Sequence, residues 1–262
     1  MALSQADKAL CLRELHAGPR AFVIANAFDP GSAALLTQLG FAALATSSGA
    51  AAGVLGRKDG QLSRDEALEH ARAIAAATEL PVSADLEDGF GESPDDVAET
   101  IRRAGGTGIV GASIEDHSGE KGTPLFPIEL AAARIAAAVQ AARALPFPGF
   151  AITARAENFF RGEPDLADTI ARLKAYEAAG ADVLFAPALP DLDAVRTVCA
   201  AVTKPVNFMV GMKGKSWDLG ALEAAGVRRV SLATSLWRAA MAGVRAAAME
   251  ARNGTFGYVD RL

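Results

Sequence analysis

Three carboxylates follow a short apolar stretch near the first third of the chain. Residues 80–82 are typical of the start of a buried strand, and Asp85, Glu87 and Asp88 come directly after it. Gathered carboxylates repel one another unless a cation or hydrogen-bond donors compensate their charge. Mg²⁺, or Mn²⁺ in its place, suits such ligands, because it usually takes one or two carboxylates plus water and substrate oxygens. We predict a metal site here, the alternative being an acidic solvated turn.

Other apolar segments in the chain end in polar residues as well. Arg155 is the cation of this set, and its alternative role is a structural ion pair with Glu115 or Glu157. Asn26 and Asn207 have the alternative role of satisfying loop backbone groups. The full set at these predicted strand ends is Asn26, Asp29, Ser47, Ser48, Gly49, Glu115, His117, Arg155, Glu157, Asn158 and Asn207.

Eight such apolar strands alternate with helices along the sequence. The strands are short and continuously apolar, which is typical of strands buried on both faces. We expect strands at 22–29, 41–46, 80–85, 108–114, 150–154, 182–186, 206–210 and 227–233. We expect helices at 4–17, 30–39, 63–78, 94–104, 128–144, 164–179, 191–202, 216–225 and 235–252. This alternation predicts a (β/α)₈ TIM barrel, a single domain over residues 1–262, with its site where the carboxyl ends of the strands converge.

The composition narrows the class of protein. The net charge is −5, from 26 basic and 31 acidic residues, and no run of Lys or Arg occurs, so we expect no nucleic-acid partner. No apolar run approaches the length of a membrane span, and the first 20 residues do not resemble a signal peptide. Cys11 and Cys199 lack metal-site spacing, which favours a reduced, cytoplasmic protein. His16 and His70 fall on predicted outer helices, where we expect them at the surface.

With these motifs in order, the chain resembles the isocitrate lyase and phosphoenolpyruvate mutase superfamily over nearly its whole length. The similarity is specific because five motifs stand on five successive predicted strand ends. They are Asn26-Ala27-Phe28-Asp29, Ser47-Ser48-Gly49, Asp85-Leu86-Glu87-Asp88-Gly89-Phe90-Gly91, Ile114-Glu115-Asp116 and Thr153-Ala154-Arg155.

The resemblance implies a site and an assembly. Mg²⁺ would lie on Asp85 with Glu87 and Glu115 near it, and a 2-oxo acid would chelate the metal. Ser48, Gly49 and the amide of Ala50 would hold the substrate carboxylate, Arg155 would face the oxyanion, and Asp59 would match a further acidic position. The last helix would swap onto a neighbouring subunit, giving a homodimer or homotetramer. The residues expected to take part are Asn26, Asp29, Ser47, Ser48, Gly49, Ala50, Asp59, Asp85, Glu87, Asp88, Glu115, His117, Arg155 and Asn207.

The segment after the fourth strand departs from the family pattern. Lyase branches carry Lys-Lys-Cys-Gly-His there, and phosphonate-handling branches carry an Asn-Ser pair and a Lys. Residues 115–123 read Glu-Asp-His-Ser-Gly-Glu-Lys-Gly-Thr, with no Cys and no Asn. This polar, glycine-rich segment is typical of a closing lid. His117 or Lys121 is our hypothesis for the proton donor.

Three functions remain open on the sequence. The first is a Mg²⁺-dependent lyase that cleaves a C–C bond in a small 2-oxo or 2-hydroxy (di)carboxylic acid through an enolate, by retro-aldol cleavage or decarboxylation. The second acts on a P–C bond, as a phosphonomutase, a carboxyphosphonate phosphorylmutase or a phosphonopyruvate hydrolase. The third is a non-catalytic barrel that binds an oxo acid. The identity of the substrate acid does not follow from the fold, because barrels of this kind host many different reactions.

Overall fold

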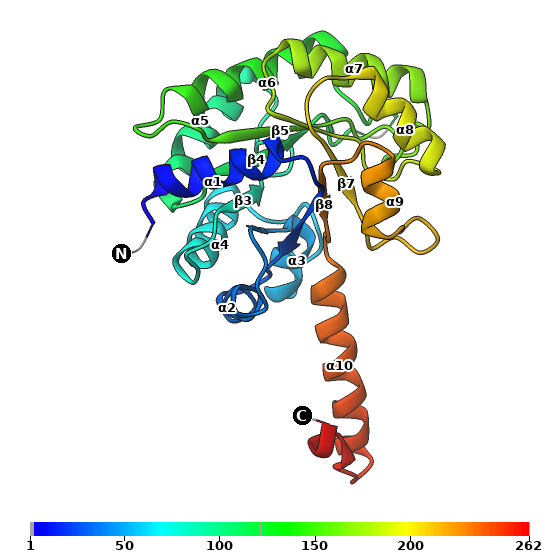
Figure 1. Cartoon of the computed structure of the whole chain (residues 1–262). Helices are drawn as coiled ribbons and strands as arrows, with labels where there is room; N and C mark the ends of the chain where they lie inside the picture. Colours follow the sequence, from blue (N-terminus) through cyan, green and yellow to red (C-terminus); the bar gives the residue numbers. More distant parts are fainter. Residues whose placement is uncertain (1–2, 121, 262) are drawn as a thin grey trace.

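The computed structural model describes residues 3–120 and 122–261, and its centre is a closed barrel of eight parallel strands. The strands follow one another around the barrel in chain order, and β1 closes it against β8, pairing Phe22 with Arg229 (Figure 1). They are β1 (Phe22–Asn26), β2 (Leu44–Ala45), β3 (Val82–Asp85), β4 (Gly111–Glu115), β5 (Ala151–Arg155), β6 (Val183–Phe185), β7 (Val206–Met209) and β8 (Arg229–Ser231). The predicted (β/α)₈ barrel is confirmed.

Helices connect these strands and surround the barrel. They are α1 (Gln5–Ala17), α2 (Pro30–Gln38), α3 (Ser48–Val54), α4 (Arg64–Ala76), α5 (Pro94–Ala104), α6 (Ile128–Arg143), α7 (Leu166–Ala178), α8 (Leu192–Ala201), α9 (Leu219–Ala224) and α10 (Ser235–Arg252), with short 3₁₀ turns η1 (Gly105–Thr107) and η2 (Gly257–Arg261). The predicted capping box of α4 is present, because Ser63 accepts from the Glu66 amide and Glu66 accepts from Ser63.

Several strands were predicted too long: those expected at 22–29, 41–46 and 227–233 are Phe22–Asn26, Leu44–Ala45 and Arg229–Ser231. Two further local predictions were also wrong. The strand expected from residue 108 begins at Gly111, because the chain first makes η1 and then a left-handed turn at Gly108, where φ is 92°. No helix was expected between residues 47 and 62, yet α3 forms directly after the second strand, capped by the Ser47 side chain. The alanines of α3 favour a helix, but its seven residues are too few to show a periodic pattern.

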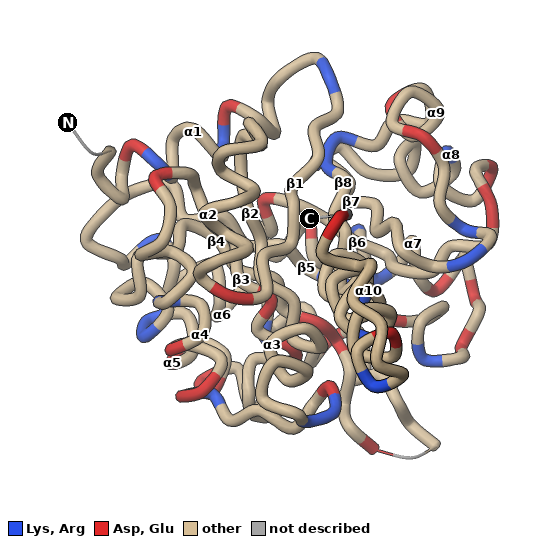
Figure 2. The backbone as a smooth tube through the Cα atoms, turned by 90° about the horizontal axis from the view of Figure 1, so that it is seen from below, with Lys and Arg blue, Asp and Glu red and all other residues tan. Residues whose placement is uncertain are grey.

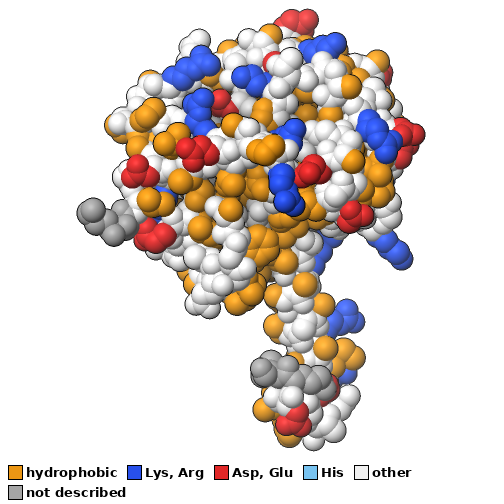
Figure 3. Space-filling model, viewed as in Figure 1, with side chains coloured by type: hydrophobic (Ala, Val, Ile, Leu, Met, Phe, Trp, Pro, Cys, Tyr) orange, Lys and Arg blue, Asp and Glu red, His pale blue; other side chains and the backbone are white. Residues whose placement is uncertain are grey.

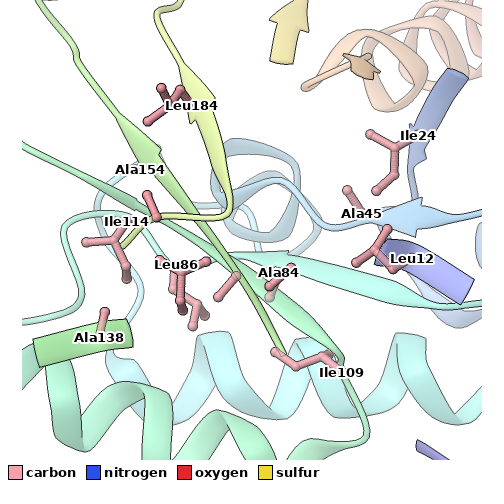
Figure 4. Close-up of a cluster of buried hydrophobic side chains, with 14 of the residues drawn as sticks. Leu12, Ile24, Ala45, Ala84, Leu86, Ile109, Ile114, Ala138, Ala154 and Leu184 are labelled. Carbon is pink, nitrogen blue, oxygen red and sulfur yellow. The ribbon is translucent and has the colours of Figure 1, made fainter. Parts of the chain in front are cut away.

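The main core lies between the outer faces of the strands and the helices. Figure 4 shows Ile114 and Leu86 near Ala138 of α6, with Ala154 on the next strand and Leu184 farther away on β6. These side chains are almost completely buried. Burying each of the larger ones stabilises the fold by about 1.5–3 kcal/mol, which keeps the barrel rigid enough to hold polar groups at its mouth.

The last helix differs from the others. Figure 1 shows α10 projecting away from the barrel, and all its described residues are at least partly exposed. It is attached at its first turn, where the Trp237 ring packs so closely on Gly53 of α3 that an added Cβ would lie 2.5 Å from it. In the described residues no helix is long and apolar enough to cross a membrane.

Candidate functional site

A cavity of about 330 Å³ opens at the carboxyl ends of the strands. Each of the eight strands, or the loop that follows it, contributes a lining residue. The strand register sets the key neighbours, because Asp85 pairs with Ser113 and Glu115 pairs with Arg155 on adjacent strands. The polar strand ends predicted from the sequence therefore meet at one mouth, as expected for a barrel of this kind.

Arg155 is the centre of the ionic network in this cavity. Its Nη1 lies 3.0 Å from Asp85, and its Nη2 lies 3.1 Å from Glu115 and 2.8 Å from Glu157. Burial alone would lower the pKa of Arg155, but the three carboxylates, Glu157 foremost, raise it above its ordinary value. The guanidinium also lies over the Phe185 ring, 5.1 Å from its centroid. Arg155 is thus a fixed, permanently charged cation.

Asp85 is surrounded by hydrogen-bond donors. Its Oδ2 accepts from the backbone amide and the hydroxyl of Ser48, each at 3.1 Å, and its Oδ1 accepts from Ser113 at 3.2 Å and from Arg155 at 3.0 Å. These contacts fix the carboxylate in orientation. The helix start at Ser48 and the strand end at Asp85 are joined directly, although 37 positions separate them in sequence.

In this site the pKa values of the Glu87 and Glu115 carboxyl groups are raised. Burial, then the charges of Asp85 and Asp59, raise the pKa of Glu87 to about 8. Burial, then Glu157, raise the pKa of Glu115 well above its ordinary value. Glu87 has a left-handed backbone, with φ of 50°, and its buried Oε1 has no hydrogen-bond partner in residues 3–120 and 122–261. An unpaired buried acceptor in a concentration of negative charge is an environment that a cation would stabilise.

Most of the predicted site residues line the cavity, but several are already engaged there. Asn26 donates to the Thr46 carbonyl at 2.5 Å, and Asn207 donates to Ser231 and accepts from Arg229. Both thus hold neighbouring strands together. The predicted residues that line the cavity are Asn26, Ser47, Ser48, Asp59, Asp85, Glu87, Glu115, His117, Arg155 and Asn207.

Of the fourteen residues expected to take part, four are outside the cavity lining in the described part of the chain, as are the strand-end residues Glu157 and Asn158. Asp29 caps α2 by accepting from the Ser32 amide at 2.6 Å, and Asp88 accepts from the Phe90 amide at 2.8 Å. The buried Ala50 amide donates to Ser47 instead of facing the cavity. Gly49 lies just behind the lining, where an added Cβ would be 3.2 Å from the Asp59 carboxylate. The reason is local: polar residues beyond a strand end also cap the next helix or turn.

Sequence reasoning missed a second arginine at the mouth. Arg161 Nη2 donates to Glu115 at 2.9 Å, and its Nε lies 3.3 Å from Glu157. Arg161 lines the cavity, with 27% of its side chain exposed, whereas the Glu157 side chain is fully buried between the two arginines. The spacing of Glu157 and Arg161 suits an i,i+4 pair, but this signal is common on protein surfaces and therefore weak.

A buried arginine at the base of the cavity was also missed. Arg229 donates to Asn207 at 2.7 Å and to Thr153 at 3.1 Å, and burial lowers its pKa to about 9. The prediction that His16 is a surface residue was wrong: His16 is buried, 3.5 Å from Arg229, and burial lowers its pKa to about 3. His70 is half-buried and contacts the Phe28 carbonyl. An arginine in an apolar strand was a readable signal of the Arg229 network.

The loop expected to act as a lid continues beyond residue 123. Its described part after Asp116, residues 117–120 and 122–125, is called the lid segment below and begins at the cavity with His117. His117 lines the cavity, and an isolated bridge pairs it with Leu125. Its Nδ1 lies 2.9 Å from the Pro124 carbonyl and 3.2 Å from the Gly119 amide. Its Nε2 is therefore the ring atom left for a substrate proton. Lys121, the other hypothesised donor, lies outside the described residues.

The raised pKa of Glu87 predicts how the free energy of unfolding depends on pH when no metal is bound. The pKa of Glu87 in the folded protein, about 8, exceeds its ordinary value of 4.5. The stabilisation that the protonated Glu87 side chain gives the folded state is therefore fully present below about pH 4.5 and is lost as the pH rises through 8. After discounting for partial exposure, we expect roughly 2 kcal/mol, or about 4–8 °C in Tm, between these limits. Thermal melts in EDTA should show this decline, and Glu87→Gln should remove it. Parallel curves for the two proteins would contradict the assignment.

Comparisons with known proteins agree with this geometry. Residues 12–252 match the family model described as phosphoenolpyruvate phosphomutase. A Burkholderia cenocepacia J2315 protein, described as a candidate lyase or mutase, has a crystal structure with a TM-score of 0.95 and 50% identity, covering 98% of this chain and 92% of that one.

Two further relatives have named activities. The oxaloacetate decarboxylase of Chromohalobacter salexigens is 31% identical, over 87% of this chain and 79% of the relative. A phosphonopyruvate hydrolase, solved in complex with oxalate and Mg²⁺, has a TM-score of 0.86 and 26% identity, covering 97% of this chain and 90% of that one. The resemblance read from the motifs is therefore confirmed, and the chain belongs to the phosphoenolpyruvate phosphomutase family, within the enzyme superfamily of PEP mutases and isocitrate lyases.

Proposed function

We propose that this protein is a divalent-metal-dependent lyase that cleaves a C–C bond in a small 2-oxo or 2-hydroxy dicarboxylic acid and leaves an enolate. The observation that carries the proposal is the position of Arg155, which is held by Asp85, Glu115 and Glu157 at the cavity beside the unpaired Glu87 carboxyl. A fixed cation there is suited to the negative charge that develops on the substrate oxygen.

The residues present fit a divalent cation of the Mg²⁺ or Mn²⁺ kind. Asp85 and Glu87 would hold it, with Glu115 nearby, and it would supply Lewis-acid polarisation of the 2-oxo group. The described residues contain no cluster of three or more His, Cys, Asp or Glu side chains arranged to hold a metal. This fits an ion that takes one or two carboxylates and completes its shell with water and substrate.

The other cavity residues would position the acid and move a proton. Ser48, fixed against Asp85 at the start of α3, would hold the substrate carboxylate. Arg161 is near Glu115 with part of its guanidinium exposed, so it would face the second carboxylate of a dicarboxylic substrate. His117 Nε2 would carry the proton at the rim, and Asp59 would remain an acidic neighbour of Glu87.

A second candidate is the cleavage or migration of a P–C bond. The family model and the phosphonopyruvate hydrolase relative favour it. The same arrangement would serve, because departure of a phosphoryl group next to an oxo acid also leaves an enolate. Against it, residues 115–123 lack the Asn-Ser pair that phosphonate-handling members carry in the lid.

One assay set separates the candidates. The protein is incubated with Mg²⁺ and a panel of C3–C6 oxo and hydroxy acids that includes oxaloacetate, malates with methyl substituents and phosphonopyruvate. Release of pyruvate, glyoxylate or CO₂ supports the lyase, whereas inorganic phosphate or a rearranged phosphonate supports P–C chemistry. Thermal stabilisation by acids of the panel with no turnover would overturn both and leave an oxo-acid-binding barrel. At a hundredfold excess over Kd, binding adds about 2.7 kcal/mol, so the melts are sensitive.

We further propose that α10 packs on a second copy of the chain. Its exposed apolar residues include Met241, Val244 and Met249. Figure 3 shows hydrophobic side chains gathered on the barrel where α10 leaves it. Leu39 and Leu55, which directly follow α2 and α3, are more than half exposed. Contiguous exposed apolar surface of this kind marks association sites.

A charge placed on α10 is expected to break this assembly. Val244→Glu should shift the protein from a dimer or tetramer to a monomer, because the carboxylate would be desolvated without a partner. Analytical ultracentrifugation reports the mass. Leu219→Glu, at a partly exposed apolar residue of α9, is the matched control and should keep the wild-type mass. A monomeric wild type would contradict the assembly.

The distribution of charge and the state of the cysteines support two further expectations, which are the lack of a nucleic-acid partner and a cytoplasmic location. Lys and Arg are interspersed with Asp and Glu along the chain, without a continuous basic stripe in the view of Figure 2. Both cysteines are free thiols, which fits a cytoplasmic setting.

A further inference from the structure

Behind the cavity wall, Asp116 is the centre of a buried hydrogen-bond cluster. Its Oδ2 accepts from the Tyr176 hydroxyl at 2.5 Å and from Arg172 Nη1 at 3.1 Å, and its Oδ1 accepts from the Glu157 amide at 2.9 Å. Arg172 and Tyr176 are four residues apart on α7, so they present one helix face to the end of β4. Asp116 is only 3% exposed, and none of these three side chains lines the cavity in the described residues.

The cluster holds both ends of the lid segment. Asp116 directly precedes residues 117–125, and Phe126 directly follows them. The Phe126 amide donates to the Asp116 carbonyl at 2.9 Å, and Arg172 Nη1 donates to the Phe126 carbonyl at 2.8 Å. One guanidinium nitrogen therefore bonds the Asp116 side chain and the Phe126 backbone, on opposite sides of the lid. Within the lid, by contrast, Gly119 and Glu120 are exposed.

The same carboxylate also fixes a partner of the central arginine. Asp116 Oδ1 holds the Glu157 backbone, and the Glu157 carboxylate accepts from Arg155 Nε at 3.0 Å and lies 2.8 Å from its Nη2. A hydrogen bond to a charged group is worth about 1.5–3 kcal/mol, and removing one partner leaves the other buried and unsatisfied. Burial and the Asp116 charge raise the pKa of Tyr176, so its hydroxyl remains a donor.

We propose that Arg172 and Tyr176 are positioning residues: through Asp116 they clamp the two ends of the lid segment and hold Glu157 against Arg155. The part of this proposal that concerns turnover rests on the proposed lyase function, whereas the clamp itself does not. Neither residue touches the cavity, so their effect on the reaction passes through the lid and through Glu157.

Amide hydrogen exchange of the whole protein tests the clamp without any substrate. In the wild type, the Phe126 and Glu157 amides should exchange far more slowly than those of Gly119 and Glu120. Tyr176→Phe, which keeps the ring and removes one donor, should speed exchange at Phe126 and Glu157 by roughly tenfold or more, the size expected for losing a hydrogen bond to a charged group. Arg172→Lys should do the same, because one ammonium cannot match the planar fork of arginine.

A matched control is available on another helix. Arg64 of α4 is half-buried and donates to the Phe90 carbonyl, in the loop after β3, at 2.9 Å. Arg64→Lys should speed exchange in that loop and leave Phe126 unchanged. Unaltered exchange at Phe126 and Glu157 in Tyr176→Phe would overturn the clamp. If the variants fail to fold, fast exchange of the Phe126 amide in the wild type would overturn it equally.

Turnover supplies the second test. With the substrate identified by the assay panel, Tyr176→Phe should lower kcat about tenfold with little change in KM, since the residue does not contact substrate. A merely structural role would lower Tm and leave kcat per folded molecule unchanged, which would overturn the positioning role. Absence of turnover in the wild type would count against the proposed lyase, while the exchange experiment would still decide the clamp.

Discussion

Replacing Arg155 with lysine should lower kcat by about a hundredfold or more while the barrel remains folded. Arginine contacts Asp85, Glu115 and Glu157 at once through three nitrogens. A single ammonium cannot keep that geometry, so the positive charge would move away from the developing oxyanion. Losing one oxyanion donor typically costs about 2.7–4 kcal/mol, which corresponds to this factor. Steady-state kinetics, with circular dichroism to verify folding, measures it.

Arg161 gives the matched control for this change. It contacts two of the same carboxylates, Glu115 and Glu157, but lies nearer solvent. In Arg161→Lys we expect less than a tenfold loss of kcat and a larger rise in KM for dicarboxylic acids, because the residue would bind the substrate tail. If Arg155→Lys retained wild-type kcat, or if the two variants behaved alike, Arg155 would be a structural ion-pair partner and the proposed reaction would lose its central group.

The fold was predictable because the barrel repeats one pattern eight times. Each strand is a short apolar run buried on both faces, and each strand end is marked by polar residues, so errors in single boundaries did not change the count. The shifts at Gly111 and in the short helix α3 arose where turn geometry or length outweighed periodicity. The orientation of α10 had no signal in the barrel pattern, because this helix projects away from the barrel instead of packing along it.

The sequence was enough to predict which strand ends form the site, but not which group each side chain contacts there. Asp85, Glu115 and Arg155 meet because adjacent parallel strands bring their carboxyl ends together. Asp29 and Asp88 have the same residue type at similar places, yet they satisfy the backbone of the following helix or turn. Residue type alone does not distinguish a cap from a cavity-lining group, since both need an exposed carboxylate oxygen near a chain reversal.

Asp85→Asn is expected to lower Mn²⁺ affinity by at least about a hundredfold, measured by the loss of the free Mn²⁺ resonance signal on titration. The neutral amide keeps the size of the side chain but removes the carboxylate whose charge acts most strongly on Glu87. Altering even an outer partner of a metal site lowers metal affinity by about 10–100-fold. Asp88→Asn is the control: Asp88 bonds the Phe90 amide at 2.8 Å and, in the described residues, does not line the cavity, so affinity should be unchanged. If Asp88→Asn lost Mn²⁺ binding while Asp85→Asn retained it, the metal ion would not lie on Asp85. The metal and the Arg155 guanidinium would then not be close enough to stabilise the same enolate, and the proposed mechanism depends on both cations.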